Sequence, residues 1–133
     1  FSRFYAIGKS AKDYLKPFEK TTLTHSFEKY IAQQSFVTQN RSFALGGPSF
    51  QWVSESIKAM EKLPEAAEKV KVPVLLVQAE CDTVVDNNCQ DFVASKFVNC
   101  RKTLIAKGFH ELLNEKPDFF EETVKEISDF IDF

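Results

Sequence analysis

The sequence predicts an α/β fold with an incomplete parallel sheet, because two short apolar runs flank a segment that suits a helix. Residues 74–77 (VLLV) form a continuous apolar run after Pro73, which is typical of a strand buried on both faces. A second run, residues 103–106 (TLIA), follows a polar turn and a helix-compatible segment. A strand, a helix and a second strand joined in this way form a parallel βαβ unit with a right-handed crossover.

The N-terminal part of the chain is predicted to hold two helices with a strong break between them. We expect residues 25–34 to form the first helix, with Thr24 as its N-cap and a stripe of apolar side chains at Phe27, Tyr30 and Ile31. Gly46-Gly47-Pro48 is the break. The second helix is expected over residues 49–62, because a buried stripe recurs at helical spacing: Phe50, Val53, Ile57 and Met60.

Three further predictions concern the ends of these elements. Pro64 is expected to end the second helix, so that residues 64–71 form a short polar helix or linker. The cluster at residues 86–88 (DNN) favours capping of the helix between the two strands. Pro117 suits the first turn of a C-terminal helix, whose apolar residues also recur at helical spacing: Phe120, Val124, Ile127 and Ile131.

Asp82 and His110 are the candidate catalytic residues. Each follows one of the two predicted strands, and the carboxyl ends of neighbouring parallel strands form the edge where α/β sheets place their chemistry. A carboxylate that orients an imidazole provides two of the three groups of an acyl-transfer triad. Asp86 is the alternative carboxylate, although it also suits a helix cap, and Glu80 is a weaker competitor. His25 is interpreted as a surface or capping histidine.

Four segments of the chain resemble the α/β-hydrolases, in particular the branch of bacterial lysophospholipases and monoacylglycerol lipases. The segments AECDTVVDN and KGFHELLNE, each after a predicted strand, are similar to the last quarter of that fold. Upstream, LTHSFEKY and GGPSFQWVSES resemble the cap of bacterial lysophospholipases. The resemblance implies cap helices and a connecting helix over residues 1–71. It also implies the C-terminal βαβα part of the hydrolase core over residues 72–133.

The same resemblance implies a function for the longer protein. It would be a serine hydrolase that cleaves the acyl ester of a lysophospholipid or monoacylglycerol, with Asp82 and His110 as catalytic residues and without metal or organic cofactor. Trp52 would line the acyl pocket under the cap, although the indole could equally pack beside the core. A carboxylesterase or a cap-bearing aminopeptidase would use the same residues.

The nucleophile of such an enzyme is absent from this sequence. No GxSxG elbow occurs, because Ser49 lies in GGPSF, which lacks the second glycine and follows no predicted strand. Cys81 is adjacent to Asp82, whereas nucleophile and acid must lie on opposite sides of the imidazole. We therefore expect the chain to be the C-terminal part of a longer enzyme and to be inactive by itself. The alternative is a non-catalytic binding module on a hydrolase scaffold.

Composition limits the class of partner. The 133 residues are 44% hydrophobic and 27% charged, as in a soluble globular protein. A net charge of −2 argues against a nucleic-acid partner, which would need clustered basic residues. The three cysteines lack the spacing of a metal site, so reduced thiols are expected. The expected location is cytoplasmic or peripheral at the inner membrane, where the lipid substrate would be met.

The predicted first strand has an edge without a partner in this sequence. In the hydrolase fold a strand from earlier in the protein would pair with the outer edge of residues 74–77, and these residues carry no charge that would protect it. Pro73 guards only the start of that edge. We therefore expect the chain to self-associate, most simply as a symmetric dimer, or to refold its cap over the edge.

Overall fold

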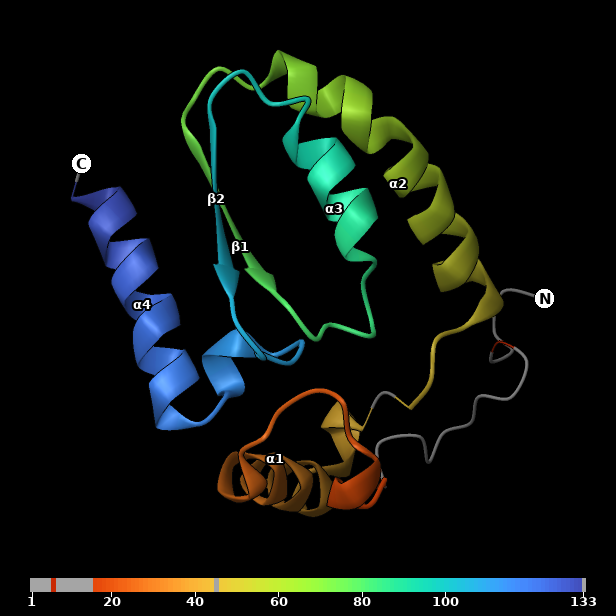
Figure 1. Cartoon of the computed structure of the whole chain (residues 1–133). Helices are drawn as coiled ribbons and strands as arrows, with labels where there is room; N and C mark the ends of the chain where they lie inside the picture. The colour runs from red at the N-terminus through yellow and green to blue at the C-terminus, as the bar shows by residue number, and fades with distance from the viewer. Residues whose placement is uncertain (1–5, 7–15, 45, 133) are drawn as a thin grey trace. The chain divides into compact units, whose positions relative to one another are not determined.

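The computed structural model describes residue 6 and residues 16–44 and 46–132, and these residues form two compact units. The first unit contains Glu28–Lys62 and the described residues up to Thr21. The second unit contains Thr22–Phe27 and Leu63–Phe133, and so includes both strands (Figure 1). Its two parallel strands and the helices around them are the arrangement expected of part of an α/β-hydrolase.

The second unit is built on the predicted βαβ unit. Strand β1 (Val74–Ala79) pairs in parallel with β2 (Cys100–Ile105), and the register runs from Val74 opposite Cys100 to Ala79 opposite Ile105. Helix α3 (Asn87–Ala94) connects them. The predicted parallel pairing is thereby confirmed, with β1 extending two residues beyond the apolar run and β2 beginning before its own.

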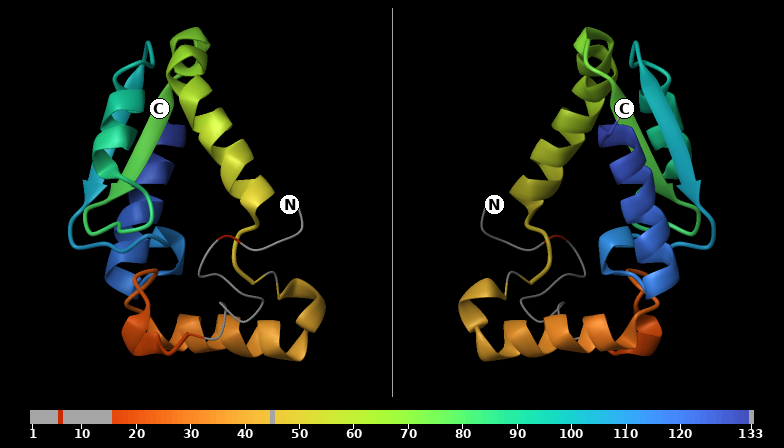
Figure 2. Two further views of the ribbon diagram at one scale, coloured as in Figure 1. Left: turned by 90° about the vertical axis from the view of Figure 1, so that its right-hand side faces the viewer. Right: turned by 90° about the vertical axis from the view of Figure 1, so that its left-hand side faces the viewer.

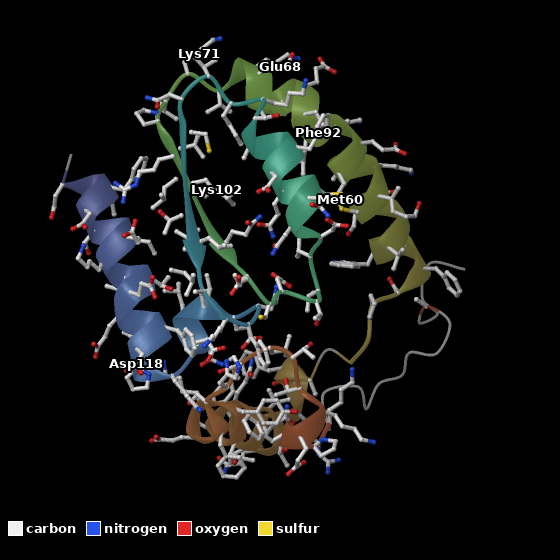
Figure 3. The ribbon with its side chains drawn as sticks, viewed as in Figure 1. Met60, Glu68, Lys71, Phe92, Lys102 and Asp118 are labelled. Carbon is white, nitrogen blue, oxygen red and sulfur yellow. The ribbon has the colours of Figure 1, made fainter. Side chains whose placement is uncertain are left out.

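The two strands are covered on opposite faces by α3 and by helix α4 (Pro117–Ile131), as Figures 1 and 2 show. On the α3 face, Lys102 of β2 extends toward the helix and its Nζ lies 2.7 Å from Asp91 Oδ1 (Figure 3). On the α4 face, Glu126 accepts hydrogen bonds from Arg101 and from the Thr103 hydroxyl. The predicted start of α4 at Pro117 is confirmed.

The buried core of the second unit lies at the carboxyl ends of the strands. Ala79 and Ile105, the last residues of β1 and β2, pack with Leu112, which follows in the short 3-10 helix Leu112–Asn114. Val77 and Phe119 pack against this cluster. Ile105 is fully buried, so the strand ends are anchored in the same place where the two candidate catalytic residues leave the sheet.

The first unit and the helix that leads from it into the second depart from the sequence predictions. Helix α1 spans Phe27–Gln39 rather than residues 25–34. Tyr30 of its apolar stripe is buried, and its hydroxyl donates to the Lys16 carbonyl (2.6 Å), but Ile31 is exposed. Thr24 lies before α1 and does not cap it: its hydroxyl donates to the Asn114 carbonyl (2.7 Å) and accepts the N–H of Ser26 (2.9 Å), which also precedes the helix.

The prediction that Pro64 ends the second helix is wrong. Helix α2 runs without interruption over Phe50–Lys69 with Pro64 inside it. A proline removes one intrahelical hydrogen bond, but the residues that follow are good helix formers, the Lys69 ammonium lies 2.6 Å from the Glu65 carboxylate, and Ala67 is buried. The predicted buried stripe of this helix is also wrong in part, because three of its four members are exposed: Phe50, Ile57 and Met60.

Candidate active site

Asp82 lies in a tight turn immediately after β1, and its carboxylate is held by that turn. Oδ1 accepts the N–H groups of Val84 (2.8 Å) and Val85 (3.0 Å), an arrangement that a short carboxylate side chain forms readily with the backbone ahead of it. The turn is itself tied to the second strand's loop, because Cys81 N–H donates to the Gly108 carbonyl (3.0 Å). The Asp82 side chain is 5% exposed.

The loop after β2 carries His110 and depends on a glycine. Lys107 has a φ of 59°, so the chain turns sharply there, and Gly108 N–H then donates to the Ile105 carbonyl (3.2 Å). A Cβ at Gly108 would lie 2.7 Å from Leu112 Cδ2 and 3.2 Å from the Ile105 carbonyl oxygen. Any larger residue at this position would therefore force the Leu112 side chain to move, because the backbone of Gly108 packs directly against it.

The two loops bring His110 and Asp82 together. His110 Nδ1 lies 2.8 Å from Asp82 Oδ2, and the imidazole is 31% exposed. Burial alone would raise the pKa of Asp82, but the hydrogen bonds from His110, Val85 and Val84 outweigh it and hold that pKa below its ordinary value. Asp82 is then ionised at neutral pH, so His110 Nδ1 carries the proton and donates it. Nε2 is left as the basic nitrogen.

The alternative carboxylates are engaged elsewhere. Asp86 is the N-cap of α3, where its Oδ1 accepts the N–H groups of Asn88 (2.7 Å) and Cys89 (3.2 Å). Glu80 Oε2 accepts the Lys107 N–H (2.8 Å). Of the carboxylates weighed in the sequence, Asp82 is therefore the one that lies against His110.

A groove of about 530 Å³ adjoins His110 in the second unit. Besides His110, its lining comes from β1, α4 and the segment after His110. Four of these residues are aliphatic, Val77, Leu112, Leu113 and Ile127, and three are polar, Glu111, Asn114 and Thr123. Neither serine nor cysteine belongs to that lining, so among the described residues no nucleophile of the predicted kind borders the groove. The described part of the chain also holds no group of His, Cys, Asp or Glu side chains suited to a metal ion.

Residues 5–117, most of the chain, match the serine aminopeptidase S33 family of hydrolases. The chain belongs to this family. Its β1–α3–β2 unit, with Asp82 and His110 at the strand ends, is the corresponding portion of an α/β-hydrolase, and the family resemblance predicted from the sequence is confirmed.

Two relatives of this chain are named lysophospholipases. The chain is 33% identical over 127 residues to a probable lysophospholipase L2 of Haemophilus influenzae, covering 96% of this chain and 40% of that protein. It is 36% identical over 133 residues to lysophospholipase L2 of Escherichia coli K12, covering 95% and 39%. This chain therefore spans about two fifths of the length of these relatives.

Sequence reasoning missed a second histidine–carboxylate pair in this S33 chain. His25, predicted to be a surface or capping histidine, is 29% exposed, but its Nδ1 lies 2.7 Å from Glu115 Oε1 and its ring stacks on Phe109 with centroids 3.6 Å apart. Glu115 is completely buried. Glu115 belongs to no periodic pattern in the sequence. It does lie five residues after His110 in the segment KGFHELLNE, which carries the family resemblance, and this position could have indicated a role near the site.

Trp52 is the remaining residue of the predicted site. Trp52 lies near the start of α2 in the first unit, and it is 64% exposed. An exposed indole is available to a ligand, but its role as a substrate-binding residue stays a prediction. Among the described residues, no helix is long and apolar enough to cross a bilayer.

Proposed function

We propose that this chain provides the histidine and the carboxylate of a serine hydrolase that cleaves the acyl ester of a lysophospholipid or monoacylglycerol. The observation that carries the proposal is the 2.8 Å contact between His110 Nδ1 and Asp82 Oδ2 at adjacent strand ends. The substrate class is supported by the names of the two lysophospholipase relatives and by the aliphatic side chains Val77, Leu112, Leu113 and Ile127 in the groove beside His110.

In this proposal a serine from the upstream part of a longer polypeptide attacks the ester carbonyl. His110 Nε2 removes the hydroxyl proton as the new C–O bond forms, and Asp82 stabilises the resulting imidazolium. The imidazolium then returns the proton to the leaving glycerol oxygen as the ester bond breaks, which leaves an acyl-serine. Water attacks the acyl-serine with the same base, and the fatty acid and the free serine are regenerated.

The two parts of the chain have separate roles in this proposal. Residues 1–71 are the cap and connecting helix that shape the acyl pocket, with Trp52 as a lining residue, and residues 72–133 are the end of the catalytic core. The enzyme would work in the cytoplasm or at the inner membrane surface, where a lipid ester with one acyl chain can be reached. Replacing Trp52 by alanine should raise KM for long acyl chains more than for short ones.

The test uses a chimera in which this chain replaces the segment that it matches in lysophospholipase L2 of Escherichia coli, so that the relative supplies the rest of the enzyme. The chimera should hydrolyse a lysophospholipid, and His110→Ala should lower kcat by about 10³- to 10⁶-fold. Lys107→Ala, in the same loop, is the matched control. A His110→Ala chimera with near-unchanged kcat would refute the assignment.

The isolated chain has a different expected behaviour. Without a positioned serine it should neither turn over a chromogenic ester nor react with a fluorophosphonate, and stoichiometric labelling would contradict this. The structure pairs β1 with β2 alone among the described residues, so the outer edge of β1 offers unpaired backbone groups. We infer that two copies pair through this edge. A compact monomer by sedimentation at high concentration, with rapid amide exchange on that edge, would exclude the dimer.

A further inference from the structure

Glu115 is a fully buried carboxylate that is saturated with donors from its own chain. Oε1 accepts His25 Nδ1–H (2.7 Å) and Phe109 N–H (3.2 Å). Oε2 accepts the N–H groups of His25 (2.9 Å) and Lys116 (3.0 Å), and the Thr24 hydroxyl oxygen lies 3.4 Å from it while donating its proton to the Asn114 carbonyl. A buried carboxylate is costly unless it is hydrogen-bonded in this way.

Apart from the N–H of the adjacent Lys116, the donors of Glu115 belong to two segments far apart in the sequence. Residues 107–111 form the loop of His110, and Leu23–Ser26 precedes helix α1, yet both lie in the same compact unit. A separate bond joins them, because Glu111 N–H donates to the Leu23 carbonyl (2.8 Å). The backbone is thus held on both sides of His110, at Phe109 through Glu115 and at Glu111 through Leu23.

His25 adds rigidity to this arrangement. Its ring stacks on Phe109 at 3.6 Å with an interplanar angle of 25°, and on Phe119 of α4 at 5.4 Å and 21°. Phe119 in turn packs against the core at the strand ends. The residue immediately before His110 is therefore fixed by its N–H and by its ring, and both contacts lead to the His25–Glu115 pair.

We propose that Glu115 is a positioning residue for His110, which acts through the Phe109 N–H and is itself held by His25. The expected effect on kcat rests on the proposed function, whereas the effect of Glu115 on the His110 loop does not. The His110 ring reaches Asp82 at 2.8 Å from a loop whose course is set on both sides of it, so loss of the Glu115 acceptor releases one side of that loop. Displacement of a catalytic group by about 1 Å is enough to lower a rate by about 100-fold.

The first test reads the loop directly in the isolated chain by amide hydrogen exchange. Glu115→Gln keeps the shape of the side chain and removes its charge, and Glu121→Gln, an exposed glutamate of α4, is the matched control. We expect Glu115→Gln to accelerate exchange at Phe109 and Glu111 by about tenfold or more relative to the ladder amides between β1 and β2. Equal acceleration of ladder and loop amides, or none, would overturn the proposal.

A second variant covers the case in which Glu115→Gln does not fold. His25→Phe retains an aromatic ring that can stack on Phe109 and deletes the Nδ1 donor, while the His25 backbone N–H can still bind Glu115. The same selective loss of protection at Phe109 and Glu111 is expected, to a smaller degree. Protection of the loop that equals that of the unaltered chain would count against the pair.

The kinetic test separates this inference from the proposed function. In the chimera with lysophospholipase L2, Glu115→Gln should lower kcat by about 10- to 100-fold with KM changed less than about threefold, because His110 is misplaced while the substrate pocket is intact. An active chimera whose kcat is unaffected by Glu115→Gln refutes the positioning role alone. An inactive parent chimera refutes the proposed function, and the exchange measurement then decides the positioning role by itself.

Discussion

Replacement of Asp82 by asparagine tests the proposed acid–base pair with the smallest change of shape. Oδ1 of Asp82 accepts two backbone N–H groups, from Val84 and Val85, so the single oxygen of an asparagine would stay on that side. The amide NH₂ would then face His110 Nδ1 in place of Oδ2. Because an NH₂ group donates, Nδ1 would have to accept, and the imidazole proton would move to Nε2. In that tautomer Nε2 cannot take a proton from serine.

The expected loss is correspondingly large. A wrong tautomer with retained geometry lowers kcat by about 10⁴-fold, which corresponds to about 5 kcal/mol of transition-state stabilisation. The assay is steady-state hydrolysis of a lysophospholipid by the lysophospholipase chimera at pH 7, with Asp86→Asn as the matched control. A loss below about tenfold for Asp82→Asn, or an equal loss for Asp86→Asn, would refute the reasoning.

Three further predictions concern the support of the site. Asp86→Ala should destabilise the chain by about 0.5–2 kcal/mol in urea unfolding through loss of the α3 cap, with chimera kcat within about twofold of the parent. Gly108→Ala should cost about 1–3 kcal/mol, because its Cβ would meet Leu112 at 2.7 Å, and Leu112→Ala in the same chain should relieve part of the cost. Burial alone would raise the pKa of Glu115, but hydrogen bonds from His25, Lys116 and Phe109 outweigh it and hold that pKa below its ordinary value of 4.5. The stability that the ionised Glu115 gives to the folded chain is therefore present above about pH 4.5 and is lost as the pH falls through the lowered pKa. The difference in unfolding free energy between the unaltered chain and Glu115→Gln should therefore shrink on acidification, and a difference that stays constant from pH 7 to 3 would contradict this.

Local sequence patterns were sufficient to predict the β1–α3–β2 unit. The apolar runs predict both strands, and the strand–helix–strand order predicts their parallel pairing, because a crossover that contains a helix is the usual connection between parallel strands. The same order places Asp82 and His110 at one sheet edge, so their contact at 2.8 Å was within reach of the sequence. The sequence favours Asp82 over Asp86 as the carboxylate partner, and in the structure the Asp82 carboxylate faces the ring while Asp86 caps α3.

The predictions failed where the result depends on contacts between distant segments. Thr24 has the features of an N-cap, but its hydroxyl donates to the carbonyl of Asn114, ninety positions along the chain, and α1 begins at Phe27. Pro64 has the features of a helix end, but good helix formers on its C-terminal side and the burial of Ala67 carry α2 through it. His25 was interpreted as a surface or capping residue because no nearby residue in the sequence indicates its contact with Glu115, a buried carboxylate ninety positions away.

Asp82 and Glu115 differ in what their carboxylate oxygens contact, and this difference separates a chemical role from a supporting one. Asp82 gives one oxygen to its own turn and the other to an imidazole that is 31% exposed beside a groove. A proton that moves at that ring can therefore reach a substrate, and the charge of Asp82 stabilises it. Glu115 has donors from its own chain on both oxygens and is completely buried, so a substrate would have to displace them to reach it. Its charge is available to the backbone of the loop and not to the reaction, which is why we expect its loss to change the position of His110 while the chemical role of the imidazole stays the same.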